Sequence, residues 1–307
     1  MKNIEKFILL AFFSILAIAV FALTTHFTKQ DPVVVSDVFQ LPNKNNIFLL
    51  DRFNQHIIAY NTETFRSTKL VNNINYFQYS SELKNDYLTS GDSITRGFEI
   101  LYKSQSKISH IYTDNNSNEA LFPLVTQGDK KLFIKTIYND QASTLTSSIN
   151  LFTDKNVLVE FPNTKGNVEK GVLQGNTLFY SGYVEKDDTY SLFKLDITSL
   201  ENKPELIRKG LISGDIYLYQ GELYTSSKDS ISNGKISYPR KFLNYFDDKS
   251  NLLIQIDVNS QAGLEMTITS IKTKALIATI ANPIDFEIFD GKVVVYCEGK
   301  IQEVKIN

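Results

Sequence analysis

The fold is decided by the stretch IDFEIF-DG-KVVVYC, which runs from Ile284 to Cys297. Its first six residues alternate between apolar and polar side chains, and this period of two is typical of a β-strand. Asp290-Gly291 is a strong signal for a tight hairpin turn, and the residues after it are rich in β-branched and aromatic side chains. The stretch therefore predicts two antiparallel strands joined by a two-residue turn.

Looser copies of this hairpin recur along the chain. Each has two short apolar-rich segments on either side of a turn rich in Gly, Asn, Asp or Lys. The hairpins span residues 37–51, 75–90, 120–137, 168–181, 215–226, 242–257 and 284–297. Their turns are roughly 40 to 46 residues apart, with one interval of about 28, and this period is typical of a β-propeller. The sequence predicts an all-β fold, a propeller of about seven four-stranded blades, with six blades as the alternative.

Two of the units depart from the pattern. The fifth has room for one strand, Lys235–Tyr238, between Ser226 and Phe242. It is therefore either an incomplete blade or a hairpin inserted into a ring of six blades. The seventh unit has three strands, and we expect Pro32–Val35 to supply a fourth, because an unpaired strand edge is a liability.

The N-terminal residues form a separate segment, in which Lys2 and Lys6 precede an uncharged apolar run from Phe7 to Leu23. Extended by Thr24 and Thr25, the run is long enough to cross a bilayer. The lysines favour a cytoplasmic N-terminus, so the rest of the chain is expected outside the cytoplasmic membrane.

This segment sets the predicted organisation of the chain. We expect a cytoplasmic tip at residues 1–6, one transmembrane helix that acts as a signal-anchor at residues 7–25, and a β-propeller domain at residues 31–307. The protein is then a single-pass cell-membrane protein with an extracytoplasmic domain. The alternative is a signal peptide cleaved near Ala17-Ile18-Ala19, in which case the protein is secreted.

The composition excludes several classes of protein. The net charge of −2 provides no basic excess, so no nucleic-acid partner is expected. Cys297 is the only cysteine, which rules out an internal disulfide and a cysteine zinc cluster. The wealth of Asn, Lys and Ile is typical of an AT-rich bacterial genome.

The strand–turn–strand units, with Ala59-Tyr60-Asn61-Thr62-Glu63-Thr64 and Lys194-Leu195-Asp196-Ile197-Thr198, resemble the blades of bacterial extracytoplasmic β-propellers of the WD40-like and NHL-like class. The regular Trp of WD40 and quinoprotein blades is absent, as is a Gly-His/Trp-Asp pair. The resemblance implies that loops between second and third strands share one face with loops between blades, around a central channel. The predicted binding residues on this face are Arg52, Phe53, Asp92, Arg96, Tyr138, Tyr183, Glu185 and Asp187.

Catalytic motifs are absent from the sequence. It has no Gly-x-Ser-x-Gly elbow, no His-Glu-x-x-His and no phosphate-binding glycine loop, and we expect no cofactor and no metal. Asp114–Glu119 begins like a calcium loop but lacks its glycine and its closing acid, so we interpret it as a polar turn. The sequence favours a binding or scaffolding module for an envelope protein, a peptide or a glycan. The alternative is a hydrolase or lyase with carboxylates at the channel mouth.

Overall fold

The computed structural model describes residues 45–51, 56–71, 77–78, 87–92, 97–103, 108–114, 119–139, 144–259 and 263–306. The chain divides into Met1–Val34 and Val35–Asn307, and every described residue belongs to the second part. The predicted transmembrane segment at residues 7–25, the segment Pro32–Val35 and the predicted strand at residues 37–41 lie outside the described residues. No helix among the described residues is long and apolar enough to cross a membrane.

The described chain folds into seven antiparallel sheets, each built from strands that are consecutive in sequence. The first sheet contains β1 (Asn46–Asp51), β2 (His56–Asn61) and β3 (Arg66–Val71). The second contains β4 (Phe77–Gln78), β5 (Tyr87–Asp92), β6 (Gly97–Lys103) and β7 (Ile108–Asp114), and the third contains β8 (Glu119–Gln127), β9 (Lys130–Asn139), β10 (Thr144–Phe152) and β11 (Leu158–Phe161).

The remaining four sheets follow in the same way. The fourth contains β12 (Asn167–Gln174), β13 (Thr177–Val184), β14 (Thr189–Asp196) and β15 (Glu205–Leu211), and the short 3-10 helix η1 (Glu185–Asp187) connects β13 to β14. The fifth contains β16 (Ile216–Tyr219), β17 (Glu222–Ser226), β18 (Ser230–Ser232) and β19 (Ser237–Pro239). The sixth contains β20 (Leu243–Asp247), β21 (Leu252–Asn259), β22 (Gly263–Ser270) and β23 (Leu276–Ala281), and the seventh contains β24 (Pro283–Phe289), β25 (Lys292–Cys297) and β26 (Lys300–Lys305).

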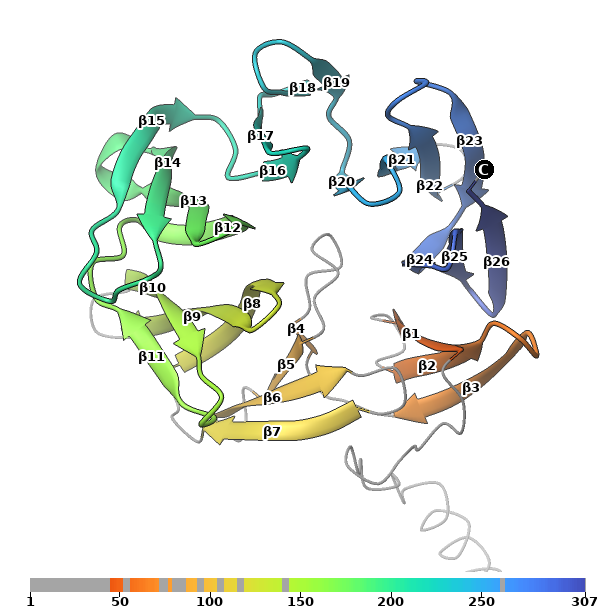
Figure 1. Cartoon of the computed structure of the whole chain (residues 1–307), viewed down its shortest axis with the longest axis horizontal. Coiled ribbons are helices and arrows are strands. Elements are labelled where there is room, and N and C mark those ends of the chain that lie inside the picture. Colours follow the sequence, from red (N-terminus) through yellow and green to blue (C-terminus); the bar gives the residue numbers. More distant parts are fainter. Residues whose placement is uncertain are drawn as a thin grey trace, which may run out of the picture. The chain divides into compact units, whose positions relative to one another are not determined.

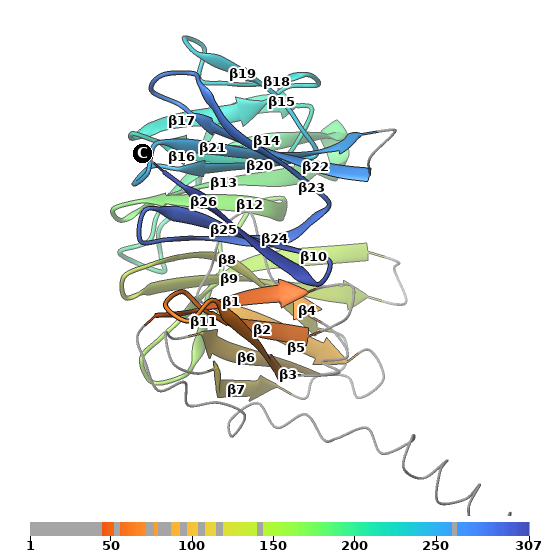
Figure 2. The ribbon, with the colours of Figure 1, turned by 90° about the vertical axis from the view of Figure 1, so that its right-hand side faces the viewer.

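Neighbouring sheets contact one another in chain order. From the second sheet to the seventh, the contacts join β5 to β8, β8 to β12, β12 to β16, β16 to β20 and β22 to β24. β24 of the seventh sheet also contacts β1 of the first, so the last sheet of the chain lies against the first (Figure 1). The side view shows these two sheets, dark blue and orange, next to each other (Figure 2).

The hydrophobic core lies between the sheets. Alternate side chains of a strand face opposite sides of its sheet, so each sheet can pack against both neighbours. Leu178 and Tyr180 belong to the cluster between the third and fourth sheets, and Ile254 and Phe286 to the cluster between the sixth and seventh. Each fully buried side chain of this size contributes roughly 1.5–3 kcal/mol. The packing of neighbouring sheets is therefore the main source of stability.

The hairpin from Ile284 to Cys297 forms as predicted, between β24 and β25. Both turn residues have positive φ angles, 45° at Asp290 and 70° at Gly291. A two-residue turn with positive φ at both positions twists in the direction that suits paired strands, and Asp-Gly adopts it at little cost. The local sequence signal and the observed backbone therefore agree.

The fifth sheet corrects the sequence-based interpretation of its unit. Where the sequence suggested room for one strand between Ser226 and Phe242, the structure has two, β18 and β19. Each is three residues long, too short for a periodic pattern to show. β18 lies before the predicted strand Lys235–Tyr238, which β19 overlaps, and the fifth sheet has four strands like those around it.

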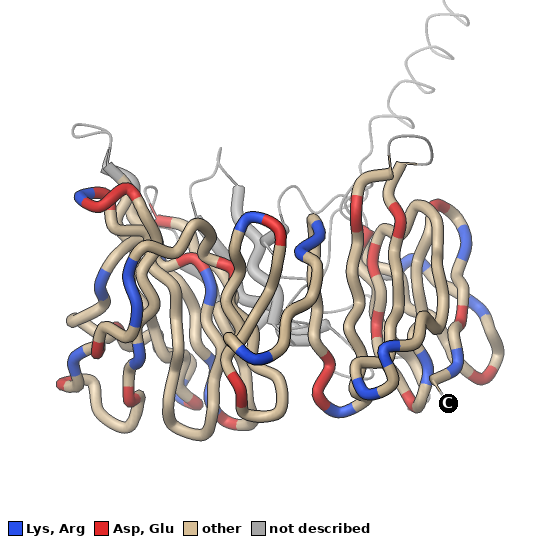
Figure 3. Tube along the Cα trace, turned by 90° about the horizontal axis from the view of Figure 1, so that it is seen from above, with Lys and Arg blue, Asp and Glu red and all other residues tan. Residues whose placement is uncertain are grey.

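Connections between strands alternate between the two ends of each sheet, because consecutive strands are antiparallel. In a four-stranded sheet, the turns that join the first strand to the second and the third to the fourth lie at one end. The loop from the second strand to the third, and the connection to the next sheet, lie at the other end, which we call the loop face. Along the described chain, basic and acidic residues are intermixed, without a block of one sign (Figure 3).

Candidate binding site on the loop face

The predicted binding residues fall into three groups. Arg52, Phe53 and Arg96 lie outside the described residues, while Asp92 ends β5 and Tyr138 lies in β9. The other three are Tyr183 near the end of β13 and Glu185 and Asp187 in η1. The structure therefore brings together these last three, which are also neighbours in sequence.

Tyr183 is held against the loop that follows it. Its hydroxyl donates a hydrogen bond to Oδ1 of Asp188 at 2.6 Å, and this bond raises the pKa of Tyr183. Its ring packs edge-to-face on the ring of Tyr190, with centroids 5.4 Å apart. The pKa of Tyr190 is raised by burial and by the negative charges of Glu169 and Asp215. The tyrosine pair thus lies between η1 and Asp215, the residue that precedes β16.

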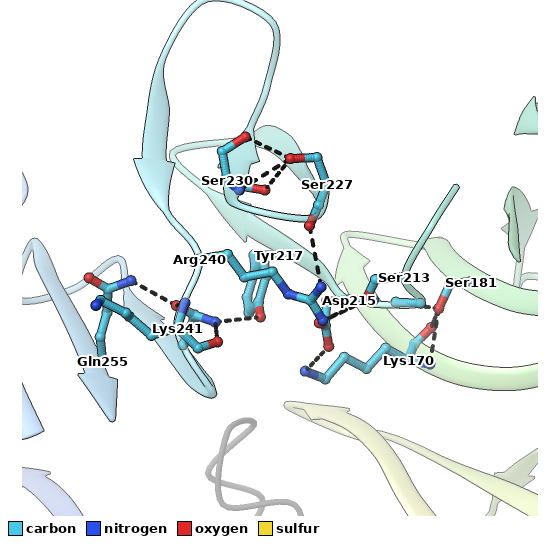
Figure 4. Close-up of polar contacts among 12 residues, drawn as sticks. Lys170, Ser181, Ser213, Asp215, Tyr217, Ser227, Ser230, Arg240, Lys241 and Gln255 are labelled. Carbon is cyan, nitrogen blue, oxygen red and sulfur yellow. Dashed lines mark hydrogen bonds and ion pairs between the residues drawn. The ribbon is translucent and has the colours of Figure 1, made fainter. Parts of the chain in front are cut away.

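Asp215 is the centre of a polar network between the fourth and fifth sheets (Figure 4). Its Oδ1 lies 3.1 Å from Nζ of Lys170, and its Oδ2 lies 2.6 Å from a guanidinium nitrogen of Arg240. Ser213 donates a hydrogen bond to Oδ2 at 2.8 Å. Burial alone raises the pKa of Asp215, but these three partners outweigh it and hold the pKa below its ordinary value. Asp215 is therefore a fixed anion with two cationic partners.

Arg240 extends the network to the fifth sheet. Its side chain donates to the backbone carbonyl of Ser227 at 3.3 Å and to Oγ of Ser213 at 3.0 Å, and its backbone N–H donates to the carbonyl of Asp229 at 2.9 Å. One side chain therefore links the connection before β16, the β17–β18 loop and the connection before β20. Planar guanidinium groups suit such multiple bonding, because their donors are fixed in direction.

A second polar group continues the network into the sixth sheet. Nζ of Lys241 pairs with Oδ2 of Asp257 at 2.6 Å, and this hydrogen bond is the largest cause of the lowered pKa of Asp257. Behind it, buried Asn244 donates to the carbonyl of Lys241 at 2.9 Å and accepts from Gln255 at 2.7 Å. Gln255 also donates to the carbonyl of Pro239 at 2.7 Å. The side-chain amides of Asn244 and Gln255 therefore hold the backbone of the segment that carries Arg240 and Lys241.

Exposed apolar residues adjoin these ion pairs in the sequence. Ile212, Phe242 and Val258 are 71%, 76% and 65% exposed, the highest values among the large hydrophobic residues that the structure describes. Each lies next to the network in sequence: Ile212 precedes Ser213, Phe242 follows Lys241 and Val258 follows Asp257. We call these three residues, together with Asp215, Arg240, Lys241 and Asp257, the loop-face patch. Exposed apolar and aromatic residues next to arginine are the combination that interfaces enrich.

The carboxylates of the described chain can be compared with what metal binding and acid catalysis need. Groups of three or more His, Cys, Asp or Glu that could hold a metal ion are absent from the part of the chain that the structure describes. Where the pKa of a described carboxyl group is shifted, it is lowered, as at Asp196, Asp215, Asp257 and Glu303. A general acid needs a raised pKa, so these four carboxylates are suited to pairing with cations.

Sequence reasoning missed most of the patch. The loop face was predicted, but Asp215 and Arg240 lie in connections between sheets, where no predicted binding residue lies. Phe242 was assigned to a strand because it is apolar, whereas β20 begins at Leu243 and leaves Phe242 in the connection. A sequence signal did exist, since Arg240-Lys241-Phe242 follows Pro239 and combines two cations with an aromatic ring.

Comparison with known proteins identifies the fold. No protein-family model matches the chain, and no curated protein sequence matches it. Among solved structures, the uncharacterised protein lmo1340 of Listeria monocytogenes is similar over 91% of this chain and 95% of its own, with 13% identity and a TM-score of 0.56. Apo AztD of Citrobacter koseri is similar over 85% of this chain and 95% of its own, with 7% identity and a TM-score of 0.51.

The β-propeller domain of the Trilobed protease of Pyrococcus furiosus, which has an open velcro topology, is also similar. The match covers 85% of this chain and 93% of that domain, with 11% identity and a TM-score of 0.50. At these identities the likeness concerns the fold and not the function. With its antiparallel sheets of three or four strands, the described chain has a β-propeller fold.

Proposed function

We propose that this protein is a membrane-anchored, extracytoplasmic β-propeller that acts as a binding or scaffolding module for another component of the cell envelope. The partner is an envelope protein, a peptide or a glycan. The observation that carries the proposal is the loop-face patch, where each of the three most exposed large apolar residues of the described chain is next in sequence to a member of an ordered polar network.

The apolar residues of the patch can contribute substantially to the free energy of binding. Complete burial of a Val, Ile or Phe side chain is worth about 1.5–3 kcal/mol, so covering all three yields at most roughly 5–9 kcal/mol. The free energy of binding is what remains after subtracting the cost of lost translational and rotational freedom and of polar desolvation. An association of moderate strength is therefore within reach of this surface alone.

The polar part favours specificity. Asp215 is paired with Lys170 and Arg240, and Asp257 with Lys241, so the patch has no isolated buried charge that binding would leave unpaired. Fixed partners also keep the loops in one arrangement, which lowers the ordering cost of binding. The same pairing is a poor basis for the alternative, a hydrolase or lyase, because that chemistry needs a carboxyl group with a raised pKa.

The membrane anchor is the second part of the proposal. The apolar run from Phe7 to Leu23, after Lys2 and Lys6, supports a single-pass signal-anchor with the propeller outside the cytoplasmic membrane. A binding module held at the membrane meets its partners in two dimensions, which raises their effective concentration. A membrane anchor would therefore strengthen the association of the propeller with another envelope component.

Photo-cross-linking in membranes tests the proposal. A photoreactive amino acid replaces Phe242 in the full chain, and a second chain carries it at Leu276, which is 62% exposed but begins β23 at the end opposite the loop face. We expect a discrete envelope adduct from position 242 that position 276 does not give. Equal adducts at both positions, or hydrolysis of cell-wall material by the purified protein, would overturn the proposal.

A further inference from the structure

The turn between β18 and β19 carries the dipeptide Asn233-Gly234, which is the only Asn-Gly pair in the sequence. Gly234 is exposed, its φ is 89°, and a Cβ at this position would meet nothing within 4 Å beyond its chain neighbours. Because glycine has no Cβ, no side chain of its own shields its backbone nitrogen. The nitrogen of Gly234 is therefore open to reaction with the side chain that precedes it.

The side chain of Asn233 is held by its own turn. Its Oδ1 accepts hydrogen bonds from the backbone N–H of Lys235 at 2.9 Å and from that of Ile236 at 2.8 Å. Two N–H groups that converge on one carbonyl oxygen stabilise the negative charge that develops there when the carbon is attacked. The Cγ of Asn233 is therefore an activated electrophile.

The attacking nitrogen has a proton acceptor beside it. The backbone N–H of Gly234 donates a hydrogen bond to Oγ of Ser232 at 2.9 Å. An N–H bond lies in the plane of its peptide group, so this hydrogen bond leaves the faces of the nitrogen free. The nitrogen and Cγ belong to adjacent residues, and closure of a succinimide ring between them needs no second molecule. The turn thus provides a nucleophile, an electrophile and a proton acceptor.

We infer that Asn233 is a site of spontaneous deamidation whose only co-reactant is water. The nitrogen of Gly234 gives up its proton, with Ser232 as the first acceptor, and forms a bond to Cγ of Asn233. The bond between Cγ and the side-chain nitrogen breaks, and that nitrogen takes up a proton and leaves as ammonia. Water then opens the succinimide: addition at Cγ gives aspartate, and addition at the backbone carbonyl carbon gives isoaspartate. This modification site goes beyond the proposed function, because no binding partner takes part.

The two products affect the fifth sheet differently. Aspartate keeps a side-chain oxygen that can accept the same two N–H groups. Isoaspartate carries its Cβ in the main chain, which lengthens a turn that begins and ends at the paired residues Ser232 and Ser237. β18 and β19 have three residues each, and next to their other ends the backbone N–H of Arg240 donates to the carbonyl of Asp229 at 2.9 Å. Isoaspartate should therefore loosen the segment that carries Arg240.

Asn156 provides an internal comparison. It is exposed and lies in the turn between β10 and β11, but Val157 follows it. The branched side chain of valine crowds the backbone nitrogen that would have to attack. Asn156 should therefore react slowly although it is as accessible to water.

Peptide mass spectrometry of the full chain, purified in detergent and stored at mildly alkaline pH, tests the inference. Trypsin cuts after Lys228 and Lys235 and releases the reacting dipeptide, and chromatography separates the aspartate form from the isoaspartate form. Digestion in water enriched in heavy oxygen marks any conversion that occurs during handling. We expect both forms at position 233, with conversion at least about tenfold faster than at Asn156.

Two comparisons separate the turn from the dipeptide. Ser232→Ala should slow the conversion severalfold, while Ser237→Ala, at an exposed serine across the same turn, should leave the rate unchanged. The free peptide of residues 229–235, blocked at both ends, should convert about tenfold more slowly than the native protein, because its N–H groups are not held toward Oδ1. This second comparison needs no variant, so it stands even where Ser232→Ala fails to fold.

The stability of the products gives an independent readout. Protein that carries isoaspartate should unfold at a Tm lower by roughly 2–4 °C, whereas Asn233→Asp should unfold close to the wild-type Tm. Equal rates at Asn233 and Asn156, or a rate in the free peptide that equals or exceeds the rate in the native protein, overturns the inference. An unchanged rate in a folded Ser232→Ala protein overturns it as well.

Discussion

Replacing Asp215 with asparagine removes the charge on which the polar network depends. Asparagine keeps the shape of the side chain and can still bond with Ser213. It no longer offers a negative charge to Lys170 and Arg240, whose nitrogens lie 3.1 Å and 2.6 Å from the carboxylate oxygens. Two cations then remain close together without a counter-charge. We expect a protein that folds but is less stable.

The expected loss of stability is about 2 kcal/mol. Removing one partner of a fully buried ion pair costs roughly 3–5 kcal/mol, whereas an exposed pair is worth about 0.2–1 kcal/mol. The side chains of Asp215 and Lys170 are 23% and 14% exposed, which places this pair between the two limits. In a domain of this size about 1 kcal/mol shifts Tm by roughly 2–4 °C, so Tm should fall by about 4–8 °C.

Thermal unfolding followed by circular dichroism, at neutral and at acidic pH, measures the effect. The pKa of Asp215 is lowered in the folded protein, so its stabilisation is present above the unfolded pKa of about 3.9 and is lost as the pH falls through the folded pKa. The difference in Tm between the wild-type protein and Asp215→Asn should therefore be largest near neutral pH and should become smaller in acid.

Asp257→Asn is the matched control. Asp257 forms a comparable ion pair with Lys241, but the two side chains are 44% and 39% exposed. Its loss should cost less than about 1 kcal/mol, or roughly 3 °C in Tm. Equal falls in Tm for the two variants, or a difference between wild type and Asp215→Asn that is the same at every pH, would refute the reasoning.

Three further predictions concern packing and exposure. Gly182→Ala should cost about 1–3 kcal/mol in urea unfolding, because an added Cβ meets the backbone oxygen of Lys165 at 2.8 Å, while Gly175→Asn, in open space at a φ of 62°, should be nearly neutral. Cys297 is buried and burial raises the pKa of its thiol, so Ellman's reagent should label it at least about a hundredfold more slowly in the native than in the denatured protein. Phe242→Ser should change the urea midpoint little, within about 0.5 kcal/mol, and should reduce binding of a hydrophobic dye.

Turn chemistry made most of the fold predictable. Asp290-Gly291 and Gln220-Gly221 join strands through positive φ angles at both residues, and such turns are encoded by two neighbouring residues. Their regular spacing then indicates repeated sheets without any knowledge of contacts between sheets. β18 escaped prediction because a three-residue strand has too few positions for alternation to be recognised, and the predicted strand Lys235–Tyr238 overlaps β19 in part.

The site was harder to predict than the fold. Asp215 and Arg240 meet at 2.6 Å although they stand 25 residues apart in sequence, and Lys170 lies 45 residues from Asp215. No local pattern encodes such a meeting, because it depends on how three sheets pack. Tyr183 and Glu185 could be placed on the loop face from the strand pattern, since their position needs only the order of strands within one sheet.

The fifth sheet has a weakness that follows from its size. Its strands have four, five, three and three residues, so it has fewer backbone hydrogen bonds of its own than the longer sheets beside it. Arg240 donates a hydrogen bond to the carbonyl of Ser227 in the β17–β18 loop, and it pairs with the carboxylate of Asp215, which precedes β16. Part of the cohesion of this sheet is therefore electrostatic and can be screened by salt. Rising ionic strength should loosen the fifth sheet before its neighbours, with earlier amide hydrogen exchange there, and a partner bound at the loop-face patch should oppose that opening.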